Sequence, residues 1–137
     1  MSRSGYVDDY DGDDYYLALG RWRAQVTSAT RGKRGQRFFL DLVAALDAMT
    51  EKHLIKNDLE TTEGAVCGLG ALGKYLGVEL SKLDSEDHDA LGAAFNIARQ
   101  LAAETMYMND ERFCTESPEA RWAAMRQWAV KQPCSSG

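Results

Sequence analysis

The sequence is poor in the residues that most often build catalytic and metal sites. Its 137 residues include two histidines, two prolines and three cysteines, Cys67, Cys114 and Cys134. An odd number of widely spaced cysteines fits neither a disulfide framework nor a zinc site. The longest apolar runs are too short to span a bilayer, and we find no signal-peptide pattern. We therefore expect a cytoplasmic protein that needs no disulfide, metal or cofactor.

The usual templates for catalysis and for phosphate loops are also missing. Cys67 lies in a small, apolar stretch, so we expect a buried free thiol, and a nucleophilic pair with His53 has little support. The glycines at 68, 70 and 73 lack the Gly-Lys-Ser/Thr ending of a phosphate loop, and their spacing is better explained by close backbone approach. The early aspartates lack the order of a calcium-binding loop. We expect a binding protein and not an enzyme.

What the chain does have is a composition and periodicity typical of a small helical domain. The hydrophobic fraction is 45% and the charged fraction 27%, which suits one globular domain over residues 1–137. The acidic opening and the polar end predict flexible segments at 1–12 and 132–137.

Apolar spacing predicts a mainly α protein of about five helices. Aspartates at 13 or 14, Asp84 or Ser85, and Ser117 followed by Pro118 are the expected helix starts. A change of pattern predicts one small β-hairpin near residues 53–66. The expected helices span about 13–27, 35–50, 66–76, 84–108 and 118–131.

Charge is segregated along the chain, although the net charge is only −5. Residues 1–16 carry five aspartates against one arginine, a net −4, and residues 17–40 carry six bases and no acid, a net +6. Residues 41–110 carry thirteen acids and five bases, a net −8. Segregation of this kind presents patches of opposite sign that steer partners.

Two segments are therefore candidate partner-binding sites. The first is acidic and aromatic, and its tyrosines add contact area at low entropy cost. Its residues are Tyr6, Asp8, Asp9, Tyr10, Asp11, Asp13 and Asp14. The second is basic and is predicted to centre on a glycine-containing turn at residues 31–36. Its residues are Arg21, Arg23, Arg31, Lys33, Arg34 and Arg37.

The basic segment has three uses that the sequence leaves open. It suits contact with nucleic-acid phosphates, docking onto an acidic protein surface, or pairing with the acidic opening of the same chain. No zinc finger, recognition helix or aromatic RNA-binding sheet indicates sequence-specific reading. Trp122 and Trp128 on the last expected helix leave a homodimer open as well.

Several stretches together resemble an uncharacterised family of small acidic phage and prophage proteins. They are the opening Met-Ser-Arg-Ser-Gly-Tyr6 with Asp8-Asp9, the segment 29–36 (Ala-Thr-Arg-Gly-Lys-Arg-Gly-Gln), 44–48, 66–73 (Val-Cys-Gly-Leu-Gly-Ala-Leu-Gly), 107–110 (Tyr-Met-Asn-Asp) and 117–122 (Ser-Pro-Glu-Ala-Arg-Trp). The chain departs from the family pattern at Gly68, where alanine is expected, and at Tyr15 and Tyr16.

The resemblance implies an accessory protein of a bacteriophage, acting in the cytoplasm of a bacterial host. Small helical phage proteins of this kind often inhibit host defence, as anti-CRISPR proteins do, so the implied partner is a host protein or nucleoprotein complex. The alternative is a regulatory or replication accessory protein that binds nucleic acid. The family supplies no catalytic residue.

Overall fold

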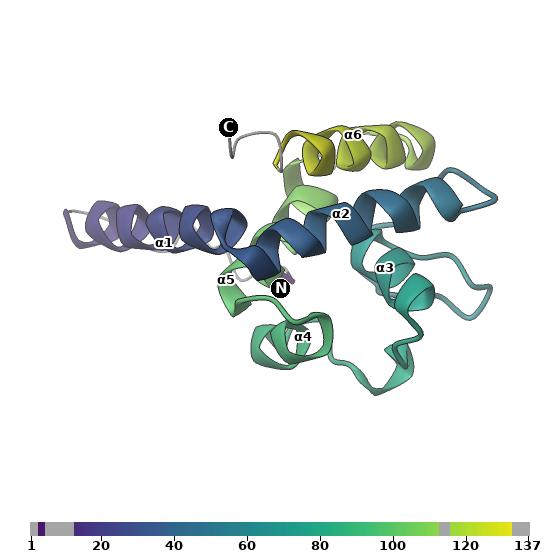
Figure 1. The fold of residues 1–137 in the computed structure, drawn as a ribbon, viewed down its shortest axis with the longest axis horizontal. Helices are drawn as coiled ribbons and strands as arrows, with labels where there is room; N and C mark the ends of the chain where they lie inside the picture. Colours follow the sequence, from purple (N-terminus) through teal and green to yellow (C-terminus); the bar gives the residue numbers. More distant parts are fainter. Residues whose placement is uncertain (1–2, 5–12, 113–115, 133–137) are drawn as a thin grey trace.

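The structure, a computed structural model, describes residues 3–4, 13–112 and 116–132. The described residues are mainly helical, as predicted, with six α-helices where about five were expected. Figure 1 shows α2 crossing the middle of the molecule while α1 projects to one side. The helices are α1 (Asp13–Arg31), α2 (Lys33–Ala48), α3 (Gly68–Leu76), α4 (His88–Phe95), α5 (Arg99–Tyr107) and α6 (Pro118–Lys131), with a 3₁₀ turn at Leu80–Lys82 and a π-helical turn at Met108–Arg112.

The predicted basic turn at 31–36 is wrong, because α1 and α2 are separated by Gly32 alone. The amide of Gly32 still donates to the carbonyl of Ser28 at 3.1 Å, so the helical pattern of α1 runs up to the junction. The two helices then cross closely at Gly35, where a Cβ atom would lie 1.9 Å from the carbonyl oxygen of Ala29. Glycine here serves close helix crossing and not a loop.

The predicted hairpin at 53–66 is also wrong, since this segment holds one isolated antiparallel bridge, between Glu60 and Val66. Leu54 makes its backbone hydrogen bonds elsewhere. Its amide donates to the carbonyl of Pro118 at 3.0 Å, and its carbonyl accepts from the buried guanidinium of Arg121 at 2.9 Å. The amide of Ile55 does donate to the carbonyl of Val66 at 2.9 Å, but with Leu54 bonded to the start of α6 the segment lacks the continuous cross-strand ladder that a hairpin needs.

The long helix expected over 84–108 is broken into α4 and α5. Asn96 adopts a left-handed conformation (φ 56°), which asparagine tolerates better than most residues, and it ends α4. Gly92 allows the turn to fold back, because a Cβ atom there would lie 2.6 Å from the carbonyl of Ile97. The cap of α4 is Asp87, whose carboxylate accepts from the amide of Ala90 at 3.1 Å, and not Asp84 or Ser85.

Two helix boundaries agree with the sequence. Gly77 ends α3 in the left-handed conformation (φ 79°), and Ser117 caps α6 ahead of Pro118, with its hydroxyl accepting from the amide of Ala120 at 3.1 Å. Loss of a serine N-cap typically costs about 1 kcal/mol.

We expect Ser117→Ala to lower the free energy of unfolding by about 1 kcal/mol, because the amide of Ala120 then loses its acceptor. Urea titration followed by circular dichroism measures the effect. Ser117→Asp restores a cap acceptor and is expected to retain wild-type stability. Equal losses in both variants would show that the hydroxyl does not act as a cap.

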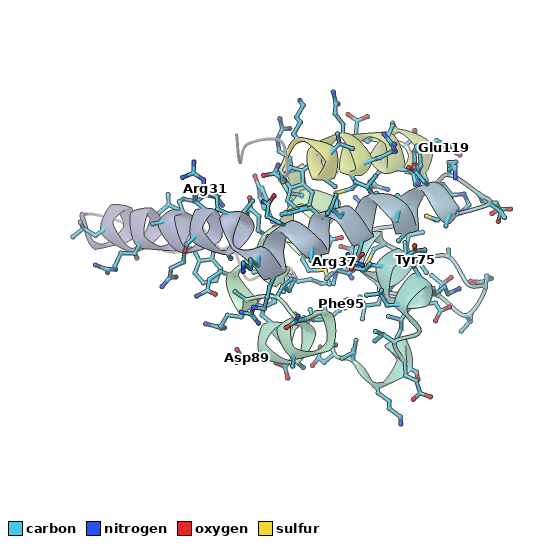
Figure 2. The ribbon with its side chains drawn as sticks, viewed as in Figure 1. Arg31, Arg37, Tyr75, Asp89, Phe95 and Glu119 are labelled. Atoms are coloured by element: carbon cyan, nitrogen blue, oxygen red, sulfur yellow. The ribbon has the colours of Figure 1, made fainter. Side chains whose placement is uncertain are left out.

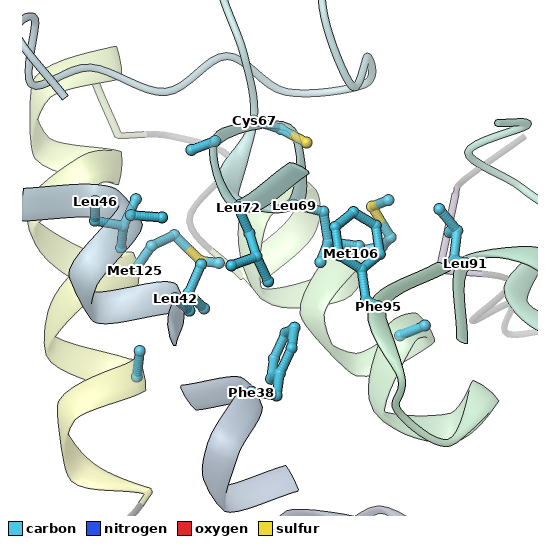
Figure 3. Close-up of a cluster of buried hydrophobic side chains, with 14 of the residues drawn as sticks. Phe38, Leu42, Leu46, Cys67, Leu69, Leu72, Leu91, Phe95, Met106 and Met125 are labelled. Carbon is cyan, nitrogen blue, oxygen red and sulfur yellow. The ribbon is translucent and has the colours of Figure 1, made fainter. Parts of the chain in front are cut away.

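The core lies on both sides of α2. Phe38, Leu42 and Leu46 face α3 and α6 and contact Leu69, Leu72 and Met125 (Figure 3). Both tryptophans of α6 pack against this core. Trp128 meets the ring of Phe39 edge-on with centroids 5.1 Å apart, and the indole nitrogen of Trp122 donates to the carbonyl of Leu46 at 3.1 Å.

Candidate functional site

The predicted acidic-aromatic site falls largely outside the described residues. Tyr6, Asp8, Asp9, Tyr10 and Asp11 lie outside them entirely. The backbones of Asp13 and Asp14 form the beginning of α1, as the sequence predicts.

The six predicted basic residues do not form one patch. Arg23 forms a two-pronged ion pair with Glu104 of α5, at 2.7 and 3.0 Å, and Arg37 pairs with Asp41 one turn along α2, at 3.2 Å. Arg21 is exposed on the projecting part of α1. These three residues are therefore spread over two helices, and two of them have carboxylate partners.

The remaining three bases gather where α1 meets α2. We call Arg31, Lys33 and Arg34 the junction surface. All three are exposed, and Figure 2 labels Arg31 on α1 near this point. Among the described residues, neither Arg31 nor Lys33 has a carboxylate within ion-pair distance, while Arg34 donates a long hydrogen bond of 3.4 Å to the side chain of Asn96. Within the described residues, no acid therefore neutralises Arg31 or Lys33.

The junction surface borders an open hollow of about 440 Å³. Lys33 and Arg34 line it together with polar side chains from α1 and α5, Gln25, Ser28 and Gln100. Cationic groups beside amide and hydroxyl groups are the set that contacts phosphate oxygens in nucleic-acid complexes. Lys33 and Arg34 are therefore the residues of the predicted basic site that line a concave, polar surface.

A second polar site, which the sequence reasoning missed, is buried inside the fold. Its centre is an ion pair between Arg3 and Asp110, whose side chains are 4% and 3% exposed. The guanidinium donates from Nε and Nη2 to the two carboxylate oxygens, each at 2.6 Å. Such a two-pronged arrangement is the strongest form of this pairing. Residues 3–4, expected to be flexible, are thus held against residues more than one hundred positions away.

The neighbours of this ion pair complete its hydrogen bonding. Oδ1 of Asp110 also accepts from the amide of Asn57 at 3.1 Å and from the side chain of Asn109 at 2.8 Å. Asn109 in turn accepts from the amide of Gly68 at 3.0 Å and donates to the carbonyl of Ile55 at 2.9 Å. The network therefore joins the chain opening, the 55–57 segment, the start of α3 and the π-helical turn.

The electrostatics of the pair follow from this geometry. Burial alone raises the pKa of Asp110, but hydrogen bonds and charge from Arg3, with hydrogen bonds from Asn109 and Asn57, outweigh burial and lower that pKa below its usual range. Burial alone lowers the pKa of Arg3, but the hydrogen bond to Asp110 and the neighbouring Cys67 and Asp110 groups raise it overall. Both partners stay ionised at neutral pH.

The sulfur of Cys67 belongs to the same site. Cys67 is fully buried, as predicted, and its sulfur accepts from the amide of Gly70 at 3.5 Å and from Nη1 of Arg3 at 3.7 Å. His53, the weakly supported partner from the sequence, instead lies beside Glu51 at 3.7 Å and lines a separate surface hollow of about 570 Å³. In the described structure Cys67 therefore has arginine and a helix start as neighbours, not a general base.

Signals for the buried site were present in the sequence as motifs without an assigned role. Arg3 lies in the opening motif, Cys67 in the Cys-Gly-Leu-Gly stretch, and Asp110 in the Asn-Asp pair. Three motifs that are far apart in the sequence therefore meet at one point. Residue spacing does not predict that these motifs are in contact, because the hydrogen bonds of Arg3 join residues 64 and 107 positions apart.

The described ranges contain no group of three or more His, Cys, Asp or Glu side chains arranged to hold a metal ion. Within the same ranges, no helix has the length and apolar character needed to cross a membrane. Comparisons with known protein families, with curated proteins and with solved structures found no match.

Proposed function

We propose that this protein is a phage accessory protein that binds a nucleoprotein complex of its host stoichiometrically and contacts the nucleic-acid phosphates through the junction surface. The observation that carries the proposal is the exposed charge of Lys33 and Arg34, which line an open hollow together with polar side chains; Arg31 is exposed at the adjoining end of α1. The family resemblance supports the phage origin. Inhibition of a host defence complex, of the anti-CRISPR kind, is the biological role that this binding would serve.

The second candidate is a regulatory or replication accessory protein that binds nucleic acid directly. The same hollow favours it, because phosphate contact requires no protein partner. The two candidates differ in what is bound when only nucleic acid is offered, and one binding experiment separates them.

We expect Lys33→Ala/Arg34→Ala to weaken binding to fluorescently labelled DNA or RNA and to lower the salt dependence of the affinity. Each lost phosphate contact reduces the slope of log K against log salt by about 0.9 on duplex DNA and about 0.7 on single strands. Fluorescence anisotropy at several salt concentrations measures both quantities. The matched control is Lys82→Ala/Lys131→Ala, which removes the same charge from exposed positions outside the hollow.

Capture from lysate of a defended host, with and without nuclease, completes the test. A nucleoprotein recovered by the wild type and lost in the Lys33/Arg34 variant supports the inhibitor. Binding to free nucleic acid without any captured protein supports the second candidate. Equal behaviour of the Lys33/Arg34 variant and its control in both experiments rejects the hollow lined by Lys33 and Arg34 as the binding site.

A further inference from the structure

The first described residues of the chain occupy a site that has the properties of a ligand pocket. Arg3 places its guanidinium against Asp110 and Cys67, and its backbone carbonyl contacts Nε2 of His88 at 2.5 Å. The next residue, Ser4, donates from its hydroxyl to the carboxylate of Glu111. Four side chains from three separate parts of the chain thus contact one dipeptide.

The groups around Arg3 match the features that distinguish the arginine side chain from other side chains. The two oxygens of Asp110 match the fork formed by Nε and Nη2, while the sulfur of Cys67 faces Nη1. A lysine ammonium is a single point charge and does not reproduce this fork. Oδ1 of Asp110 also accepts from the amide of Asn57 and the side chain of Asn109, so the carboxylate is held in place for its partner.

We infer that Asp110, Cys67, His88 and Glu111 form a recognition site for an Arg-Ser dipeptide, and that the chain fills this site with its own Arg3-Ser4 as a latch. A latch of this kind is an intramolecular ligand, whose occupancy depends on its affinity and its effective concentration. When it leaves, the fully buried Cys67 loses one of its covering groups. The labelling rate of Cys67 therefore reports whether the latch is docked.

The test uses full-length protein in which Cys114 and Cys134 are replaced by serine, so that a thiol reagent reports Cys67 alone. In this background Arg3→Ala is expected to speed the labelling of Cys67 by about tenfold or more under native conditions and to lower Tm. A synthetic Ser-Arg-Ser-Gly peptide should slow the labelling again and raise Tm as its concentration increases. The Ser-Lys-Ser-Gly peptide is the matched control and should have little effect.

Three results would overturn the inference. They are labelling of Arg3→Ala at the wild-type rate, equal rescue by both peptides, and rescue by the arginine peptide that persists when Asp110→Asn is added to Arg3→Ala. Should Arg3→Ala fail to fold, Arg3→Lys keeps the charge and most of the volume. It is then expected to fold with faster Cys67 labelling that the arginine peptide slows, and a wild-type rate in this variant would equally reject the site.

Discussion

Asp110→Asn is expected to lower the free energy of unfolding by about 3–5 kcal/mol, the usual cost of removing one partner from a buried ion pair. The amide keeps the shape of the carboxylate but leaves the guanidinium of Arg3 charged, buried and without its counter-ion. It also replaces one acceptor oxygen with a donor, in a site where Arg3, Asn57 and Asn109 all donate. Urea or guanidinium titration measures the loss.

Asp47→Asn is the matched control, because Asp47 also forms a two-pronged pair with an arginine, Arg126, at 2.6 and 3.0 Å. That pair is on the surface, where solvent screens the charges. We expect a much smaller loss of stability for Asp47→Asn. Similar losses in the two variants would mean that burial adds nothing to the Arg3–Asp110 pair.

The same pair makes a definite prediction about pH. The folded-state pKa of Asp110 lies below that of the unfolded chain, about 3.9. Its contribution to stability is therefore fully present above the unfolded pKa and is lost as the pH falls through the folded pKa. The stability difference between wild type and Asp110→Asn should be constant near neutral pH and should shrink below about pH 4. A stability difference between wild type and Asp110→Asn that grows as the pH falls would contradict a lowered pKa of Asp110 in the folded state.

Gly70→Ala is expected to lower the free energy of unfolding by about 3 kcal/mol, the upper part of the usual range for overpacking. A Cβ atom at this position would lie 2.0 Å from the carbonyl oxygen of Leu59 and 3.0 Å from the Cβ of Val66. Neither neighbour is the end of a flexible side chain, so the backbone of α3 or of the 59–66 segment has to move. Thermal and urea unfolding both measure the effect.

The control is Gly20→Ala, where an added Cβ atom meets nothing within 4 Å. Alanine stabilises an exposed helix interior by up to about 1 kcal/mol relative to glycine. The two substitutions are chemically identical and should have effects of opposite sign. A destabilising Gly20→Ala, or a neutral Gly70→Ala, would remove close approach as the reason for glycine in α3.

Local sequence signals predict three features correctly: the helical class, the glycine-dependent packing of α3 and the start of α6. Each of these features depends on residues that are close together in the sequence. The errors arise where distant contacts decide the outcome. Residues 54–66 have strand-like composition, but Leu54 bonds to Pro118 and Arg121 instead of to a second strand. The apolar pattern continues through Asn96 without interruption. The helix ends there because the chain turns back after Asn96 and the amide of Ile97 donates to the carbonyl of Gly92.

The candidate sites divide in the same way. Clustered charge predicts exposed bases near residue 31. Arg31, Lys33 and Arg34 are exposed, in agreement with that prediction. Clustered charge does not predict that Arg23 is neutralised, because its partner Glu104 lies 81 positions away. The Arg37–Asp41 pair, by contrast, joins residues four positions apart on one helix and is a local signal. The buried site at Asp110 could not be predicted either, because its two charged partners, Arg3 and Asp110, are 107 positions apart in the sequence.

The position of Arg3 also governs how the protein should be handled in the laboratory. Arg3 is buried and doubly bonded to Asp110, so an affinity tag or label placed directly beside it would displace the latch. Lys131, at the end of α6, is exposed. A partner search should therefore use bait that is attached through Lys131 and not beside Arg3.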